Sequence, residues 1–548
     1  MKTRIKTALY GLIAAAFCLI LSACAGPGGG DKSPSAPKTS AYLTFLDTEP
    51  ALADPQRISE KYTVVLNVFD RLAEEKEEDG RNRMVPSLAD SWEVSGDGLV
   101  YTFRLHPGVT FSNGAALTAE DVEFTFHRLI SHPESRNRDL AMSILGAEAL
   151  REKKTDKLAG FKIIDDLTFT ITLAYPCATF LEGLTTPGAS ILDKETTLKA
   201  GDAFGRTPET TVGTGPFVLT EWTKYKGIVM KANPKCWSGP PKCDGLSMHF
   251  YAENSPLRQM FLNGELDILD LDKLGIDAEY FLRGDIYRKN VIRGHRVGIS
   301  YIALNQSLPP LQDVRVRKAL QLALDRKTLM QTAISNRGIL ENGIFPRGLK
   351  GHNPGLPEIP FDPAKARQLL QEAGYPGGFD LTISYSDTTA QRVKEMLRLT
   401  AAMWKKIGVR ASLMEMENRS FLNRRNHGEL ACYTGTWSAD YNDPDNFISA
   451  FFGSRENSLG RSLCYPNEAV MKRVVDARSI VDPEARIREY RFLEKKVIQD
   501  DAAWIPLYSG YHFFAVNERV NGFHVRWNGW SSNRYADVSI KAEADRGN

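Results

Sequence analysis

The sequence predicts an α/β protein with two lobes, of which the second is inserted into the first. Before residue 298, most strand-like segments alternate apolar and polar residues, as half-exposed β-strands do. Residues 299–413 instead follow a strand–helix–strand order, which indicates βαβ units and a partly parallel sheet. After residue 504 the strand patterns resemble the first half again. The chain therefore crosses between the lobes near residues 298 and 504, and two such crossings can act as a hinge.

In the first lobe, residues 92–105 alternate around a Ser-Gly-Asp-Gly turn and predict a β-hairpin. Thr118 and Asp121 have capping-box spacing ahead of an apolar helix face. Residues 167–173 predict another half-exposed strand, and residues 64–72 a helix. We interpret the acidic run at residues 74–79 as a solvated surface.

The second lobe contains the elements that indicate βαβ order. Asp362 and Pro363 are typical of a helix start, and Gly374 and Gly408 of helix ends. The expected strands are residues 299–304, 379–385 and 409–413, and the expected helices are residues 313–330, 362–373, 393–407 and 483–499. Strands at 504–516 and 523–530 then complete the first lobe.

The N-terminus has the pattern of a secreted, lipid-modified protein. Residues 1–6 are basic, residues 8–21 are almost wholly apolar, and small residues follow, as in a signal peptide comprising residues 1–23. Leu21-Ser22-Ala23-Cys24 resembles the lipobox of bacterial lipoproteins, so we expect acylation of Cys24. Residues 24–40, rich in Gly, Pro and Ser, would form a flexible tether. The protein would contact the membrane only through this lipid. It would lie at the outer face of the cell membrane or in the periplasm.

Composition limits the classes of partner. The chain has 548 residues, 42% hydrophobic and 25% charged, enough for two or three domains with real cores. Loss of residues 1–23 changes the formal net charge from +2 to −1, so no positive excess favours nucleic acid. The nine histidines are scattered, and His127 and His132 would not share a helix face. We expect no metal, no cofactor and no nucleic-acid partner.

Five cysteines remain beyond Cys24, and no pair has C-x-x-C spacing. Cys236 and Cys243 bracket a turn-prone loop that could bring them together as a disulfide, which the extracytoplasmic setting permits. The pairing of Cys177, Cys432 and Cys464 is left open, and the odd number leaves at least one thiol unpaired in a monomer.

The segment from Trp437 to Phe447 is the candidate ligand site. It follows an alternating run and is rich in Asn, Asp and Pro, which favour turns. Asp440 lies between Trp437 and Tyr441 in the sequence, so a bound cation could meet both a carboxylate and aromatic rings. A plain solvated turn is the alternative.

Catalysis is poorly supported. No His-Glu-x-x-His or Gly-x-Ser-x-Gly motif is present. Asp440, Asp443 and Asp445 resemble an acid–base set only by proximity, and neighbours in a turn need not converge on one bond. We therefore expect a binding protein and not an enzyme.

Several motifs in register resemble the family 5 extracellular solute-binding proteins, the oligopeptide, dipeptide and nickel receptors of ABC importers. The similarity spans roughly residues 42 to 530. It is carried by residues 88–94, 97–105, 108–122, 212–217, 233–237, 313–320 and 437–444.

The resemblance implies a periplasmic-binding-protein-like fold with mixed sheets, a hinge, and an extra subdomain in the N-terminal lobe. Lobe I would comprise residues 41–297 and 505–548, and lobe II residues 298–504. A monomeric receptor would close over a peptide and deliver it to permease subunits in the membrane. The alternatives are another solute, such as an oligosaccharide or a nickel chelate, or a role in peptide sensing.

The resemblance also assigns roles to site residues. Asp440 stands where peptide-binding members hold the free α-amino group, and Arg425 where oligopeptide members carry a site arginine. A second site arginine is replaced by Thr434, and a cysteine found in some members by Ser438. These departures leave peptide length and the mode of carboxylate binding open.

Overall fold

The computed structural model describes residues 42–78, 81–251, 255–273, 278–283, 288–526 and 533–541. The expected signal peptide, Cys24 and the tether lie outside these residues. None of the helices described has the length and apolar content needed to traverse a bilayer.

A 12-stranded mixed sheet organises the described chain, in the order β16-β15-β17-β13-β18-β11-β1-β10-β9-β8, with β12 and β14 also paired to β18. Its strands are β1 (Tyr42–Asp47), β8 (Phe217–Thr223), β9 (Gly227–Ala232), β10 (Gly245–Phe250), β11 (Ile268–Asp270), β12 (Val291–His295), β13 (Gly298–Leu304), β14 (Gly338–Leu340), β15 (Asp380–Ser386), β16 (Arg410–Met416), β17 (Cys432–Ser438) and β18 (Trp504–Val516).

Smaller sheets and the helices complete the fold. The smaller sheets are β2 (Ala73–Glu78) with β3 (Arg81–Pro86); β4 (Ala89–Val94), β5 (Val100–Leu105), β7 (Thr168–Thr172) and β6 (Phe161–Asp165); and β19 (Val520–Asn521) with β20 (Ser539–Ile540). The helices are α2 (Thr63–Val68), α3 (Ala119–Ser131), α4 (Ala147–Arg151), α5 (Phe180–Gly183), α6 (Lys194–Ala200), α7 (Leu257–Leu262), α8 (Ala278–Arg283), α9 (Val314–Leu322), α10 (Arg326–Thr332), α11 (Pro363–Glu372), α12 (Gln391–Lys405), α13 (Asn418–Asn426), α14 (Asp445–Phe452), α15 (Arg455–Leu459), α16 (Glu468–Asp476) and α17 (Pro483–Lys495).

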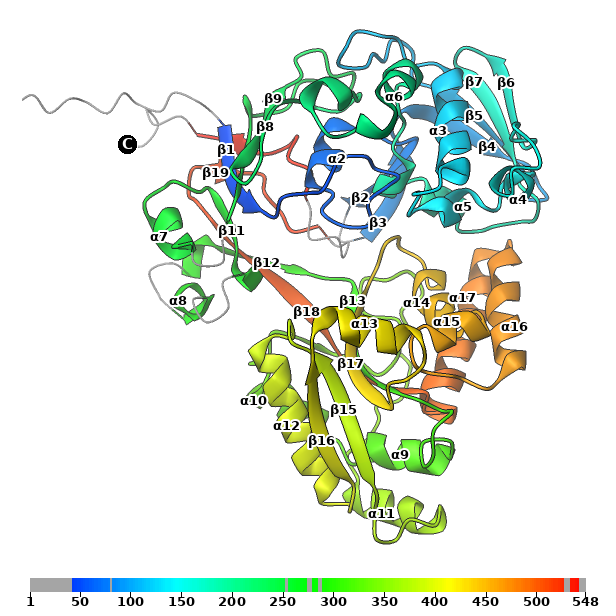
Figure 1. Ribbon diagram of the computed structural model, residues 1–548, viewed down its shortest axis with the longest axis vertical. Coiled ribbons are helices and arrows are strands. Elements are labelled where there is room, and N and C mark those ends of the chain that lie inside the picture. Colours follow the sequence, from blue (N-terminus) through cyan, green and yellow to red (C-terminus); the bar gives the residue numbers. More distant parts are fainter. Residues whose placement is uncertain are drawn as a thin grey trace, which may run out of the picture. The chain divides into compact units, whose positions relative to one another are not determined.

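The long strand β18 takes part in two sets of strand pairs (Figure 1). Up to Gly510 it pairs with β13 and β14, and from Tyr511 onward with β11 and β12. Its residues are mostly buried on both faces, which explains the near-continuous apolar run of its sequence.

The hydrophobic clusters divide at the same places. Three clusters draw on residues before 293 and after 512. The other two clusters contain only residues 297–508. In the first of them, α9, α11 and α12 pack with β13 and β15. In the second, α14, α16 and α17 pack with β13 and β17.

Several expected local structures are present. β4 and β5 form the expected antiparallel hairpin. β15 and β16 pair in parallel, and α12 connects them. The backbone N–H of Thr118 donates to Asp121 Oδ2 at 3.0 Å and caps α3. Asp362 caps α11 through the N–H of Lys365 at 2.8 Å.

Other expectations were wrong in detail. The helix expected over residues 313–330 is split into α9 and α10, because Asp325 caps a new helix by accepting from the N–H of Thr328 at 3.0 Å. Residues 523–526 form no strand, and the remainder of the strand expected there lies outside the described residues.

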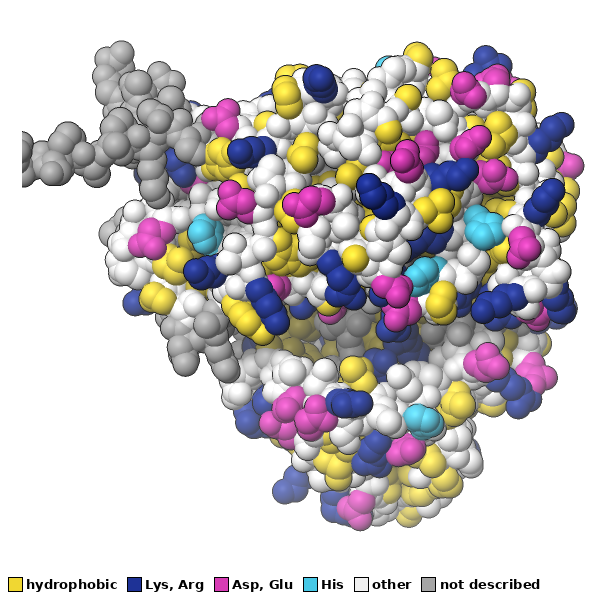
Figure 2. Space-filling view, turned by 45° about the horizontal axis from the view of Figure 1, so that its top comes forward, with side chains coloured by type: hydrophobic (Ala, Val, Ile, Leu, Met, Phe, Trp, Pro, Cys, Tyr) yellow, Lys and Arg dark blue, Asp and Glu magenta, His cyan; other side chains and the backbone are white. Residues whose placement is uncertain are grey.

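The first residue of the acidic run, Glu74, is buried, so the expectation of a solvated surface was wrong at this position. Glu74 is 8% exposed and forms ion pairs with Arg71, Arg526 and Arg534, at 3.2, 3.3 and 3.3 Å. Burial alone would raise the pKa of Glu74, but the three guanidinium groups lower it overall. Elsewhere, basic and acidic side chains are interspersed over the face drawn in Figure 2.

The expected Cys236–Cys243 disulfide is absent, and both thiols are free. Cys236 Sγ lies 3.4 Å from Ser238 Oγ and 3.9 Å from the carbonyl oxygen of Thr214. Cys243 Sγ instead faces the carbonyl oxygen of Gly245, within an apolar cluster that raises its thiol pKa to about 11. The two side chains therefore have different surroundings, although the loop between them is short.

Candidate functional site

The end of β17 carries the stretch that the sequence singled out. Ile299 of β13 pairs with Trp437, and the N–H of Ala439 donates to the carbonyl oxygen of Val297 at 2.8 Å. These bonds end at Ala439, so Asp440 and Tyr441 lie in the loop before α14. The expected strand-to-loop junction is therefore present.

A cavity of about 660 Å³ opens beside this loop, within the usual size range of ligand pockets. Trp437, Asp440, Tyr441 and Arg425 all line it. The first part of the chain also contributes to the lining, through Ser59, Tyr62, Arg136, Asn137, Asp139, Leu140 and residues 186–188.

Asn446 orients Asp440. The N–H of Asp440 donates to Asn446 Oδ1 at 3.0 Å, and Asn446 Nδ2 donates to Asp440 Oδ2 at 3.2 Å. Asn446 is only 8% exposed, whereas Asp440 is exposed. The main-chain carbonyl of Asn446 also accepts from Trp437 Nε1 at 2.9 Å. One buried amide thus contacts both Trp437 and Asp440 and holds them at the lining of the cavity.

Arg461 packs on the Trp437 ring, a contact that the sequence did not predict. Its guanidinium carbon lies 4.7 Å from the ring centroid. Burial lowers the pKa of Arg461, as does the positive charge of Arg425, whereas Asp440 raises it. Two cations and one carboxylate therefore lie close together in the cavity. The Trp437 ring, which we expected to contact a bound cation, therefore contacts Arg461 of the same chain.

The other acids of the stretch have structural partners. Arg486 forms two hydrogen bonds with Asp443, at 2.6 and 2.7 Å, and both side chains are almost fully buried. Arg478 Nε lies 2.8 Å from Asp445 Oδ1. Arginines therefore hold Asp443 and Asp445, whereas Asn446 holds the exposed Asp440 at the cavity.

Tyr441 and Tyr62 contribute neutral phenols. Tyr441 OH donates to Asp445 Oδ2 at 3.3 Å, and burial followed by the charge of Asp445 raises its pKa well above the usual value. Burial also raises the pKa of Tyr62, with Asp440 the next cause. Asp440 therefore lies near enough to Tyr62, a residue of the first part of the chain, to affect its pKa.

Arg425 is the fourth expected site residue. It lies near the end of α13, and its Nε and Nη2 donate to Asn426 Oδ1 at 3.2 and 2.9 Å. Within the described residues no group of three or more His, Cys, Asp or Glu is placed to hold a metal ion.

The family model of the bacterial extracellular solute-binding proteins, family 5 (middle region), matches residues 83–458. The chain belongs to this family. It is accordingly a solute-binding protein of the ABC-transporter type that works outside the cytoplasm, and its family is one of binding proteins without catalytic activity.

Family 5 relatives cover nearly the whole chain. Heme-binding protein A of Haemophilus influenzae is 30% identical over 547 residues, with 93% of this chain and 96% of that protein covered. The dipeptide-binding protein of Escherichia coli is 29% identical over 481 residues, with 84% and 86% covered. The structure of HbpA2 from Haemophilus parasuis matches with a TM-score of 0.76 at 26% identity, covering 91% of this chain and 99% of that one. The expected two-lobed, periplasmic-binding-protein-like fold is confirmed.

Proposed function

We propose that this family 5 protein captures peptides outside the cytoplasmic membrane and delivers them to the permease of an ABC importer. The observation that carries the proposal is the exposed Asp440, which the buried Asn446 holds at the lining of a cavity of about 660 Å³. A carboxylate held in this way can accept hydrogen bonds from the ammonium group of a peptide.

The chemistry of the cavity suits a peptide better than a neutral solute. A charge-assisted bond from an ammonium group to Asp440 would stabilise the complex by about 1.5–3 kcal/mol. Arg461 and Arg425 supply donors for peptide carbonyl oxygens and, in the shortest peptides, for the terminal carboxylate. Main-chain recognition of this kind tolerates varied side chains, since these can lie in wet pockets.

The relatives bear the names of proteins that bind different ligands, so the ligand needs a direct test. Denaturing the purified protein and identifying the released molecule by mass spectrometry would reveal a copurified ligand. Calorimetry with di-, tri- and tetrapeptides, heme, a maltooligosaccharide and a nickel chelate would then rank affinities. Binding of peptides at micromolar or lower Kd supports the proposal. Binding of heme or another solute, with no peptide bound, would overturn it.

We further propose that the chain is anchored through an acylated Cys24 and acts as a monomer. The support is the sequence from Leu21 to Cys24 after a basic start and an apolar run. Mass spectrometry of the mature N-terminus should find a lipid-modified cysteine. A soluble product beginning at Ala25 or later would exclude acylation.

Closure of two lobes over the peptide completes the proposal. The division of the hydrophobic clusters supports lobes joined near residue 298 and within β18, and the change of partners after Gly510 favours a return crossing somewhat later than residue 504. An ion pair joins residues of the two lobes, since Lys350 Nζ lies 3.1 Å from Glu182 Oε1.

A further inference from the structure

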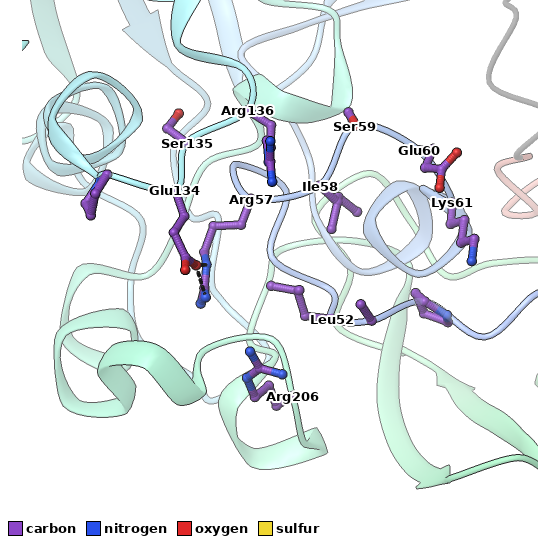
Figure 3. A pocket seen from close by; sticks show the side chains of 13 residues that line it. Leu52, Arg57, Ile58, Ser59, Glu60, Lys61, Glu134, Ser135, Arg136 and Arg206 are labelled. Atoms are coloured by element: carbon purple, nitrogen blue, oxygen red, sulfur yellow. Dashed lines mark hydrogen bonds and ion pairs between the residues drawn. The ribbon is translucent and has the colours of Figure 1, made fainter. Parts of the chain in front are cut away.

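A second cavity of about 790 Å³ adjoins the one that contains Asp440. Its lining comes from loops at residues 50–61 and 133–136 and from Arg206. Ser59 and Arg136 line both cavities, so the two spaces meet at these side chains. Figure 3 shows this second cavity, with Arg57 and Glu134 turned toward each other between Arg136 and Arg206.

The lining of this cavity carries more positive than negative charge. Its basic residues are Arg57, Lys61, Arg136 and Arg206, and its acidic residues are Glu60 and Glu134.

Only part of this positive charge is neutralised. Glu134 is paired with Arg57. Lys61 Nζ and Arg206 Nε donate to main-chain carbonyl oxygens, at 3.3 and 3.2 Å, which leaves their charge in place. The Arg136 guanidinium makes no hydrogen bond or ion pair within the described residues.

Buried contacts hold the loops of the second cavity in place. Arg128 Nη2 lies 2.6 Å from Asp54 Oδ2, in an ion pair beneath the first loop. The N–H of Arg136 donates to the carbonyl oxygen of Gln56 at 2.8 Å, and Asn137 Nδ2 donates to the carbonyl oxygens of Pro55 and Ile58 at 2.9 and 2.8 Å. The basic side chains therefore stand on a prearranged backbone, which reduces the entropy lost when a ligand binds.

We propose that this basic cavity binds the terminal carboxylate of a peptide whose amino group is held at Asp440. The inference rests on the proposed function and adds a ligand class, namely peptides long enough to pass from the first cavity into the second. Arg136 stands at the junction, and Arg206 and Lys61 lie beyond it. An extended peptide grows by about 3.3–3.6 Å per residue, so only peptides above a minimum length reach these cations.

The test compares peptides of two to six residues, each as free acid and as C-terminal amide, by calorimetry at low salt. With the wild-type protein, amidation of the longer peptides should weaken binding about tenfold or more, whereas N-acetylation should weaken binding at every length. Arg136→Gln and Arg206→Gln, singly and together, should weaken binding of the long free acids and reduce the effect of amidation. Long amidated peptides should bind the Arg206→Gln and wild-type proteins equally.

Lys199→Gln is the matched control, because it removes an exposed positive charge of the same part of the chain outside both cavities. It should leave the amidation effect unchanged. Unaltered melting temperatures would show that the variants are folded, as expected for the exposed Arg136 and Arg206.

The outcomes separate this inference from the proposed function. If peptides bind and depend on Asp440, but amidation costs the same in the double variant as in the wild type, the basic cavity does not hold the carboxylate. If no peptide binds at all, the proposed function itself fails. A uniform loss for acids and amides alike would indicate that the arginines only shape the cavity, which also contradicts the proposal.

Discussion

Replacing Asp440 with Asn tests the proposed amine site most directly. The change removes the charge but keeps an oxygen that can still accept the hydrogen bond from Asn446 Nδ2, now at 3.2 Å. Asp440 is exposed, so its pair with an ammonium group should contribute less than the about 3–5 kcal/mol lost when a fully buried pair is broken. We expect a loss of about 1.5–3 kcal/mol, or about 10- to 150-fold in Kd.

The assay is a double-mutant cycle by calorimetry, with N-acetylation of the peptide as the second change. Both changes delete the same interaction, so their combined effect should be clearly smaller than the sum of the two. Glu456→Gln serves as the matched control, since Glu456 is an exposed acid of the same cavity, and its loss should add independently to that of acetylation. Additive losses for Asp440→Asn would refute the reasoning, and full binding of the acetylated peptide would remove the amine site altogether.

Three further predictions concern stability and closure. Asp443→Asn should destabilise the fold by about 3–5 kcal/mol in urea unfolding, because it leaves Arg486 buried without its counter-charge. Asp440→Asn should change the free energy of unfolding by no more than about 0.5 kcal/mol, and equal effects of the two substitutions would contradict the assigned roles. Burial raises the pKa of Glu494 to about 8, so between about pH 4.5 and 8 the native state holds one proton more than the unfolded state, and this group's contribution to the free energy of unfolding falls by about 1.4 kcal/mol per pH unit as pH rises. The stability difference between wild type and Glu494→Gln should shift accordingly between pH 5 and 8, and a constant difference would argue against the raised pKa. Saturating peptide should reduce the radius of gyration in solution scattering if the lobes close, and an unchanged profile would count against closure.

Local patterns in the sequence were sufficient for much of the fold. The alternation around residues 92–105, the capping spacing of Thr118 and Asp121, and the apolar run at residues 504–516 each describe interactions among neighbours in the chain, and the structure contains the corresponding hairpin, helix cap and strand. The acid and aromatic residues at 437–441 were likewise recognisable, because a strand end followed by turn-forming residues can be read from composition.

Long-range partners could not be read from the sequence. Contacts that depend on how the β17–α14 loop folds back give Asn446, Arg461 and Arg478 their roles. Glu74, which we expected to be solvated, is buried and paired with arginines more than 400 residues away. The same holds for the free thiols of Cys236 and Cys243 and for the basic cavity, whose walls come from three separate loops. Sequence spacing determined which local elements form. Only tertiary packing decided which charges are buried, which are paired, and which face a cavity, because these depend on neighbours that are distant along the chain.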